Sequence, residues 1–187
     1  MRIIGGTRRG TILAEVGQGD PAAHLRPTSD RVREAIFNLL VNGTHGNPLP
    51  GAVVLDLFAG TGALGLEAIS RGAAFVTFVD DGAVAQRLLR ANIAKLRLEG
   101  ETRILRQDAR RLPPNPGAAC GLVFLDPPYG KAMGEVVLPL AAAGGWLAPG
   151  AMIVWEESTP PLPPAGFAQI DQRRYGETLV TLMRGPE

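Results

Sequence analysis

The chain is poor in the residues that build metal centres and disulfide frameworks. It has one cysteine, Cys120, and two histidines, His24 and His45, among 187 residues. A single thiol cannot form an intrachain disulfide, and a thiol with no neighbouring histidine is not a metal site. We therefore expect no metal, interpret Cys120 as a small buried residue beside a strand, and assign the histidines no role.

Long apolar runs are also missing. None approaches the roughly 20 residues needed to span a bilayer, and no charged start followed by an apolar core marks a signal peptide. With 45% apolar and 20% charged residues, the chain fits one folded domain. We expect a cytoplasmic protein without membrane association and, since no extra interface helix or heptad pattern appears, a monomer.

Charge is nearly balanced, at a formal net charge of +1. Its distribution is uneven, because residues 1–33 contain more arginines than acids. The arginines are Arg2, Arg8, Arg9, Arg26, Arg31 and Arg33, and the acids are Glu15, Asp20 and Asp30. Lysine occurs only at positions 95 and 131, so arginine carries nearly all the positive charge throughout the chain. The use of arginine in residues 1–33 is therefore by itself weak support for an anionic partner.

The apolar pattern divides the chain into an N-terminal extension, residues 1–45, and a main domain, residues 46–187, in one compact unit. Short strands at Met1–Ile4 and Thr11–Val16 form a predicted hairpin, and Ser29 or Asp30 then caps a helix that ends near Asn42. From Val53 onward apolar strands alternate with helices, which is typical of a parallel sheet covered on both faces. The predicted strands are Val53–Phe58, Phe75–Asp80, Thr102–Asp108, Leu122–Leu125, Met152–Glu156 and the antiparallel pair Ala168–Tyr175 and Thr178–Met183; the helices are Ala63–Arg71, Ala83–Leu98 and Glu135–Ala143.

A glycine loop follows the first of these strands. Gly60, Gly62 and Gly65 have the spacing that allows a tight turn and close approach of the backbone to a nucleotide-like ligand. Asp80 ends the next strand, 20 residues after Gly60, where a carboxylate can accept two hydrogen bonds from a ribose. The loop therefore predicts an adenosine cofactor.

Asp56 favours one such cofactor. A carboxylate inside the strand before the loop would repel a pyrophosphate, whereas S-adenosylmethionine carries an amino group and a sulfonium but no phosphate. A nicotinamide-dependent enzyme is the alternative, but this sequence has no evident group for hydride transfer. Asp108 ends the third strand, where it can contact the adenine amino group; an ordinary helix-capping role is the other interpretation.

The sequence Asp126-Pro127-Pro128-Tyr129 follows a buried apolar strand. The two prolines restrict the backbone and keep its carbonyls out of a helix. The Asp126 carboxylate, the Pro127 carbonyl and the Tyr129 ring can then face a flat, amine-bearing base. We predict catalysis on an exocyclic amino nitrogen, with Asp126, Pro127 and Tyr129 as catalytic residues.

These motifs resemble those of Rossmann-like S-adenosylmethionine-dependent methyltransferases. The wider pattern is similar to the RsmD family of bacterial 16S ribosomal RNA guanine-N2 methyltransferases, and covers nearly the whole length. It rests on Met1 to Gly6, Leu25 to Glu34, Val54 to Gly72, Asp126 to Tyr129 and Arg173 to Gly176. Residue 80 is Asp where the family commonly has Glu, and Glu177 stands where lysine is frequent.

The resemblance implies an α/β Rossmann-like methyltransferase fold, with a seven-stranded, mostly parallel sheet and an antiparallel C-terminal strand. It implies S-adenosylmethionine held by Asp56, Phe58, Ala59, Gly60, Thr61, Gly62, Asp80, Asp81, Asp108, Ala109 and Asp126. It also implies 16S ribosomal RNA, in the small subunit or its assembly intermediate, bound by Arg8, Arg9, Arg26, Arg31, Arg33 and Arg174. A DNA adenine-N6 methyltransferase and a non-catalytic RNA-binding assembly factor remain the alternatives.

Overall fold

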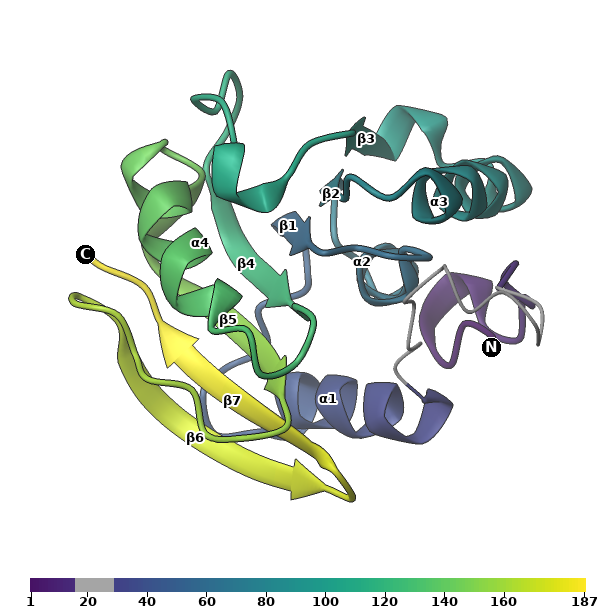
Figure 1. Cartoon of the computed structure of the whole chain (residues 1–187). Coiled ribbons are helices and arrows are strands. Elements are labelled where there is room, and N and C mark those ends of the chain that lie inside the picture. The colour runs from purple at the N-terminus through teal and green to yellow at the C-terminus, as the bar shows by residue number, and fades with distance from the viewer. Residues whose placement is uncertain (16–28) are drawn as a thin grey trace.

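The computed structural model describes residues 1–15 and 29–187. Within these ranges the chain forms one mixed sheet with helices packed on both faces (Figure 1). Residues 25–28 of the Leu25 to Glu34 motif, including Arg26, lie outside the described residues. Val16, at the end of the predicted second strand, also lies outside them.

The sheet has seven strands in the order β3-β2-β1-β4-β5-β7-β6. The first five strands are parallel, and β7 is antiparallel to both β5 and β6. This confirms the predicted α/β class and the antiparallel C-terminal hairpin. The strands are β1 (Val53–Leu57), β2 (Phe75–Val79), β3 (Thr102–Leu105), β4 (Cys120–Leu125), β5 (Leu147–Glu157), β6 (Ala168–Tyr175) and β7 (Thr178–Arg184).

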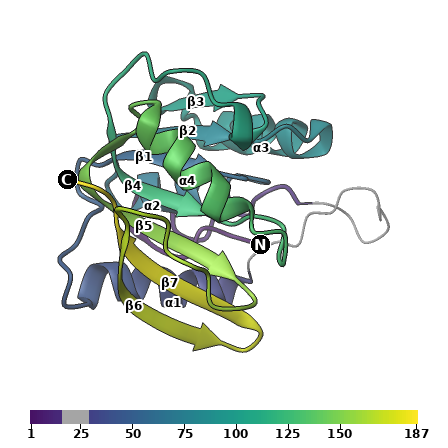
Figure 2. The same ribbon diagram turned by 60° about the vertical axis from the view of Figure 1, so that its left-hand side comes forward.

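Four α-helices cover the sheet: α1 (Asp30–Asn42), α2 (Ala63–Ser70), α3 (Ala83–Leu96) and α4 (Met133–Ala143). Helices α1, α2 and α3 contribute to one apolar core, in which the rings of Phe37 and Phe124 lie 5.6 Å apart. Helix α4 packs on the opposite face, where Val137 and Leu138 meet Trp155. Figure 2 shows α4 and α1 on the two sides of the sheet. Alternating strand residues therefore enter two separate cores, as the continuous apolar strands predicted.

Ser29 caps α1, because its hydroxyl accepts a hydrogen bond from the Val32 amide at 3.2 Å. The side-chain oxygen satisfies one of the amides that a helix leaves open at its first turn. The sequence had left Ser29 and Asp30 as equal candidates. Asp30 is instead the first helical residue, and its carboxylate binds Arg33.

The predicted N-terminal hairpin is shorter than expected. Its antiparallel direction is right, but only a single bridge between Arg2 and Ile12 forms, around a 3-10 turn at Gly6–Arg8. The amides of Ile4 and Gly5 donate to the Glu67 carboxylate of α2 instead of to a partner strand. Backbone hydrogen bonds still join the two segments, from the Ile3 amide to the Thr11 carbonyl at 2.9 Å and from the Leu13 amide to the Met1 carbonyl at 3.1 Å. The pairing is therefore short, and Glu67 of the main domain holds the residues that follow it.

In residues 1–15 and 29–187, no helix has both the length and the apolar character to cross a bilayer. Over the same ranges, histidine, cysteine, aspartate and glutamate side chains form no cluster of three that could hold a metal ion.

Candidate active site at the carboxyl edge of the sheet

The chain order reverses between β1 and β4, which are parallel neighbours with Leu57 opposite Leu125. The chain leaves β1 toward β2 and β3 on one side, while β4 leads to β5 on the other. Open sheets of this kind bind ligands in the crevice outside the carboxyl ends of the strands at such a reversal. The glycine loop follows β1 and the Asp126 turn follows β4, so both predicted motifs meet at this edge.

The glycine loop adopts backbone conformations that only some residues tolerate. Phe58, Gly60 and Gly62 have φ angles of 60°, 54° and 79°. A Cβ on Gly62 would also lie 2.4 Å from the Leu89 side chain. Glycine adopts a positive φ without strain, but Phe58 carries a side chain, so its left-handed conformation is strained. The surrounding loop must hold this residue in place.

Asp80 links this loop to the one after β2. Its two carboxylate oxygens accept hydrogen bonds from the Gly60 and Gly82 amides, both at 2.8 Å. Burial raises the pKa of the Asp80 carboxyl, against the lowering effect of these amides. Gln86 holds the backbone beneath it by donating to the Asp80 carbonyl at 2.7 Å. Both oxygens retain a second lone pair, so the carboxylate can still accept from a ribose.

Asp56 lies beneath the loop and is 2% exposed. Its side-chain oxygen accepts from the Gly65 amide in the first turn of α2 at 3.0 Å. Burial raises the pKa of the Asp56 carboxyl well above its usual range, and the charges of Asp126 and Asp80 raise it further. The three carboxylates are therefore close enough to influence one another.

The Asp126 turn is fastened to strands on both sides of β4. The Asp126 amide donates to the Leu57 carbonyl at 3.4 Å, and the Gly130 amide donates to Glu157 of β5 at 3.2 Å. The Tyr129 hydroxyl lies 3.3 Å from the hydroxyl of Thr178, the first residue of β7. The carboxylate and the ring are both half-buried. Residues 126–129 therefore follow β4 at the carboxyl edge of the sheet, with Pro127 buried, and their catalytic roles stay predictions.

Asp108 takes the alternative, capping role. Its carboxylate accepts from the Arg110 amide at 2.9 Å and pairs with the Arg110 guanidinium at 2.7 Å. The Arg110 hydrogen bond lowers the pKa of the Asp108 carboxyl. The expected contact with adenine stays a prediction. Of its neighbours in the predicted set, Asp81 is exposed and Ala109 is buried.

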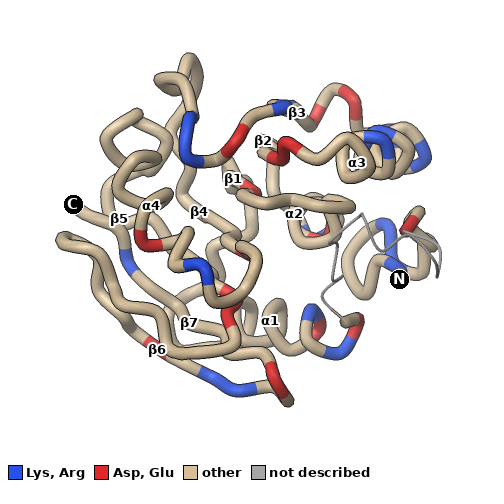
Figure 3. The backbone as a smooth tube through the Cα atoms, in the orientation of Figure 1, with Lys and Arg blue, Asp and Glu red and all other residues tan. Residues whose placement is uncertain are grey.

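The predicted RNA-binding arginines among the described residues lie in different parts of the structure. Arg9 and Arg31 line one cavity of about 300 Å³, together with Arg2, Asp30 and Glu34. Figure 3 shows basic residues on the N-terminal turn beside those at the start of α1. Arg8 is half-buried and its guanidinium lies 3.5 Å from Glu101. Arg174 is exposed near the end of β6, where it pairs with Leu179, the residue after Thr178, whose hydroxyl contacts the Tyr129 hydroxyl.

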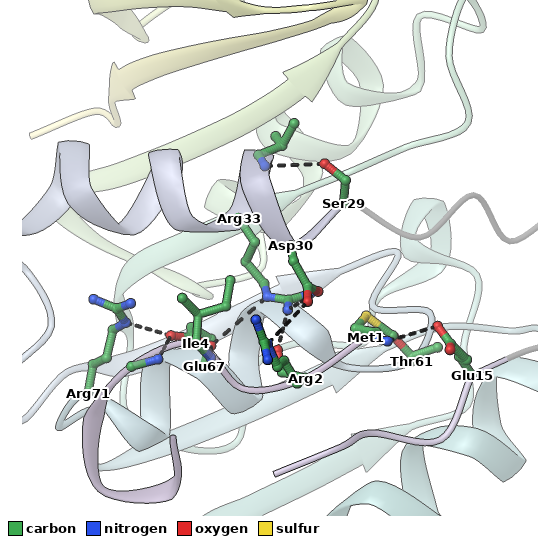
Figure 4. A network of polar contacts seen from close by, with 12 residues as sticks. Met1, Arg2, Ile4, Glu15, Ser29, Asp30, Arg33, Thr61, Glu67 and Arg71 are labelled. Atoms are coloured by element: carbon green, nitrogen blue, oxygen red, sulfur yellow. Dashed lines mark hydrogen bonds and ion pairs between the residues drawn. The ribbon is translucent and has the colours of Figure 1, made fainter. Parts of the chain in front are cut away.

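The prediction of Arg33 as an RNA contact is wrong. The side chain is fully buried, and its guanidinium donates to the Arg2 carbonyl and to Asp30 (Figure 4). It also lies 4.0 Å from the buried carboxylate of Glu67. Arg33 sits one helical turn inside α1 on the face that meets α2, so it cannot reach an RNA backbone.

Sequence reasoning missed three polar residues that build this region. Glu67 is fully buried and accepts hydrogen bonds from Ile4, Gly5 and Arg71. Asn92 of α3 is fully buried against the glycine loop, and Thr178 holds Tyr129. A charged residue inside the apolar α2 segment was a usable signal for Glu67, whereas nothing local distinguished the other two.

The residues of the loop fit S-adenosylmethionine. Residues 58–65 contain no lysine or arginine, and the carboxyl groups of the buried Asp56 and the half-buried Asp80 accept hydrogen bonds from the Gly65 and Gly60 amides. Such a loop suits a ligand with a ribose and a positive charge, and it disfavours a pyrophosphate. The donor set of the site is therefore one of carboxylates and glycine amides.

This topology, with a glycine loop and an Asp-Pro-Pro-Tyr turn at the reversal point, defines the class of Rossmann-like methyltransferases. A putative methyltransferase from Escherichia coli has the same fold, with a TM-score of 0.83 and 33% identity over 100% of this chain and 98% of that one. The chain belongs to the RsmD family, since the family model described as "Conserved hypothetical protein 95" matches residues 1–184. Two curated relatives are both called "Ribosomal RNA small subunit methyltransferase D". The one from E. coli K12 is 38% identical over 97% of this chain and 88% of its own length; the one from Haemophilus influenzae is 33% identical over 94% and 89%.

Proposed function

We propose that this protein transfers a methyl group from S-adenosylmethionine to the exocyclic N2 of a guanine in 16S ribosomal RNA of the small subunit. The observation that supports the proposal is that the glycine loop follows β1 and the Asp126 turn follows β4, which are parallel neighbours with Leu57 opposite Leu125. The two relatives named for small-subunit ribosomal RNA support the substrate.

Asp80 and the backbone of Phe58 to Gly62 would hold the cofactor, with Asp81, Asp108 and Ala109 at the adenine end. When bound, S-adenosylmethionine supplies a methyl group on a positively charged sulfur. The contribution of the chain is to hold the acceptor nitrogen in line with that methyl at near-attack distance, which dominates the rate of a direct displacement. Asp56, beneath the loop, keeps α2 and the loop backbone in place.

Asp126 and Pro127 act on the acceptor nitrogen. The lone pair of the guanine amino group is delocalised into the ring, so the nitrogen is a poor nucleophile. Acceptors at the Asp126 carboxylate and the Pro127 carbonyl bind its two hydrogens and favour a pyramidal geometry. Asp126 also stabilises the positive charge that develops on the nitrogen and can take up its proton.

Tyr129 stacks on the base, an interaction worth roughly 1 to 3 kcal/mol for bases on aromatic side chains. A base inside a duplex cannot enter the crevice, so the target guanine is unpaired or flipped out. The RNA backbone is bound by Arg9 and Arg31 on one side of the site and by Arg174 on the other. Arg8 adds to the first group, and Arg26 remains part of the proposal.

We include a cytoplasmic monomer in the proposal, because one chain carries both the catalytic turn and the arginines. Light scattering of the purified protein tests the monomer directly. A dimer would leave the chemistry unchanged and would alter only the size of the RNA-binding surface.

The decisive experiment uses labelled S-adenosylmethionine with small ribosomal subunits from a strain lacking the corresponding methyltransferase, followed by mass analysis of the nucleosides. We expect one N2-methylguanosine per 16S molecule. Asp126→Ala should lose about 100-fold or more in rate, as expected when a group acting on the transferred proton is removed. Asp171→Asn, an aspartate remote from the crevice, is the matched control and should retain activity. Label in adenine, or transfer to duplex DNA, would refute the proposal.

A further inference from the structure

We propose that Asn92 is a positioning residue for the glycine loop, and that through it RNA binding and cofactor binding strengthen each other. The link is the N-terminal segment, defined here as Met1–Glu15. The inference rests on the proposed function, because it takes S-adenosylmethionine and ribosomal RNA as the two ligands.

Asn92 joins the N-terminal segment to the glycine loop. Its side-chain amide donates to the Thr61 carbonyl at 3.0 Å and to the Ala14 carbonyl at 3.2 Å. Its carbonyl oxygen accepts from the Ala14 amide at 2.6 Å. Thr61 stands between Gly60 and Gly62, at the centre of the loop. One side chain of α3 therefore holds both segments at once.

Asn92 is fully buried, so its bond to Thr61 is made away from water, and its two bonds to Ala14 are partly buried. Buried backbone groups that lose their partners are unfavourable, so Thr61 and Ala14 depend on the same side chain. If the N-terminal segment moves away, Asn92 loses two of its three partners and gains freedom to rotate. The Thr61 carbonyl is then no longer held in the conformation that the strained loop requires.

A second attachment ties the segment to α2, the helix that continues from the loop. The Ile4 and Gly5 amides donate to Glu67 at 2.7 and 2.8 Å, and the Arg8 amide donates to the Ser70 hydroxyl at 3.0 Å. Figure 4 shows Ile4 and Glu67 in contact beside Arg33. The segment is thus held by Asn92 near its end and by α2 near its start.

The proposed RNA contacts lie between these attachments. Arg9 is exposed and lines the cavity that it shares with Arg31 of α1. A phosphate held by both guanidinium groups would fix the segment against α1 and so favour the state in which Asn92 keeps all its partners. Binding free energies are reciprocal, so a cofactor that orders the loop must strengthen RNA binding by the same factor.

Equilibrium dialysis of labelled S-adenosylhomocysteine, a product that cannot react, measures the coupling. Unmethylated small ribosomal subunits should lower its Kd for the unmodified protein by about 5-fold or more, within the usual range of such couplings. Asn92→Ala should reduce this ratio to about one. Asn115→Ala is the matched control, because Asn115 also donates to two backbone carbonyls and accepts from one amide, in a loop after β3. It should keep the full ratio.

Two results would overturn the inference alone: a ratio of one for the unmodified protein, or an Asn92→Ala variant with weaker binding but the same ratio. Absence of any S-adenosylhomocysteine binding would overturn the proposed function as well. Hydrogen exchange on the unmodified protein needs no variant. Adding S-adenosylhomocysteine should slow exchange of the Ala14 amide, and unchanged exchange would contradict the coupling.

Discussion

The Tyr129 and Thr178 hydroxyls are 3.3 Å apart, although 49 residues separate them in sequence. The contact joins the turn after β4 to the first residue of β7, so the C-terminal hairpin helps to orient the ring. The two prolines stiffen the turn, but they do not by themselves determine where the tyrosine points.

Substitutions at this pair should separate orientation from stacking. Tyr129→Phe and Thr178→Val both remove the contact and keep a ring, so each should raise the KM for small subunits several-fold with little change in kcat. Tyr129→Ala removes the stack itself, worth roughly 1 to 3 kcal/mol, and should lower kcat/KM by about 5-fold to 150-fold. Steady-state kinetics distinguish these cases. Equal effects of Phe and Ala would show that the ring does not contact the base.

As the pH is lowered, cofactor affinity should begin to fall at a higher pH than it would if Asp80 had the pKa of an ordinary aspartate. Burial raises the pKa of Asp80, so its carboxyl gains a proton at a higher pH than usual. Ribose hydroxyls donate to the ionised form, so affinity is complete above the raised pKa and is lost as the pH falls through it. Asp108 does not contribute in this window, because Arg110 lowers the pKa of its carboxyl.

Calorimetric titration of S-adenosylhomocysteine across the acid range tests this dependence. Asp80→Asn should bind more weakly at every pH and lose most of the pH dependence. Asp56→Asn, a change beneath the loop, should leave the Asp80 dependence in place. An unmodified protein whose affinity does not change with pH would exclude Asp80 as the ribose acceptor.

Glu67→Ala should be strongly destabilising. The buried carboxylate accepts from Ile4, Gly5 and Arg71, and it lies beside the fully buried guanidinium of Arg33. Removing one partner of a buried charge pair costs about 3–5 kcal/mol, because the other charge stays buried. Glu67→Gln keeps an acceptor and should lose less. Urea unfolding measures the difference, and Arg173→Ala, which removes the exposed member of a pair with Asp171, should leave the midpoint nearly unchanged.

Gly65→Ala should affect both stability and cofactor binding. A Cβ at this position would lie 2.4 Å from a Phe78 ring carbon and 2.7 Å from a Val76 methyl carbon, so α2 must move away from the sheet. Overpacking of this kind costs typically about 1–3 kcal/mol. Gly100→Ala meets no atom within 4 Å and serves as the control in thermal unfolding. Equal stability of the two variants would mean that the helix adjusts freely.

Local patterns predicted the sheet and the centre of the site. The proximity of Gly60 and Asp80 could be predicted because a parallel sheet brings the ends of neighbouring strands together, and the Gly60 amide does donate to Asp80 at 2.8 Å. The family resemblance extended this to the RNA substrate. Strand limits were less accurate: β5 begins five residues before its predicted start, where Leu147 pairs with Cys120.

Burial of charge could not be predicted from spacing. Arg33 and Arg31 are two residues apart on α1, yet one is fully buried and the other is exposed, because only one faces α2. The sequence does not say which face of α1 meets the N-terminal segment. Glu67 and Asn92 were missed for the same reason, since their partners in the N-terminal segment lie 62 or more residues away.

The distance in sequence between Glu67 and its amide partners also constrains the order of folding. Ile4 and Gly5 are 63 and 62 residues from the side chain that receives their hydrogen bonds, and closing so long a loop is slow. Strands β1 and β2 pair residues only 22 apart, such as Val53 with Phe75, so we expect this pair to form first and the first few residues to dock later. In pulse-labelled hydrogen exchange during refolding, the amides of β1 and β2 should become protected before those of Ile4 and Gly5.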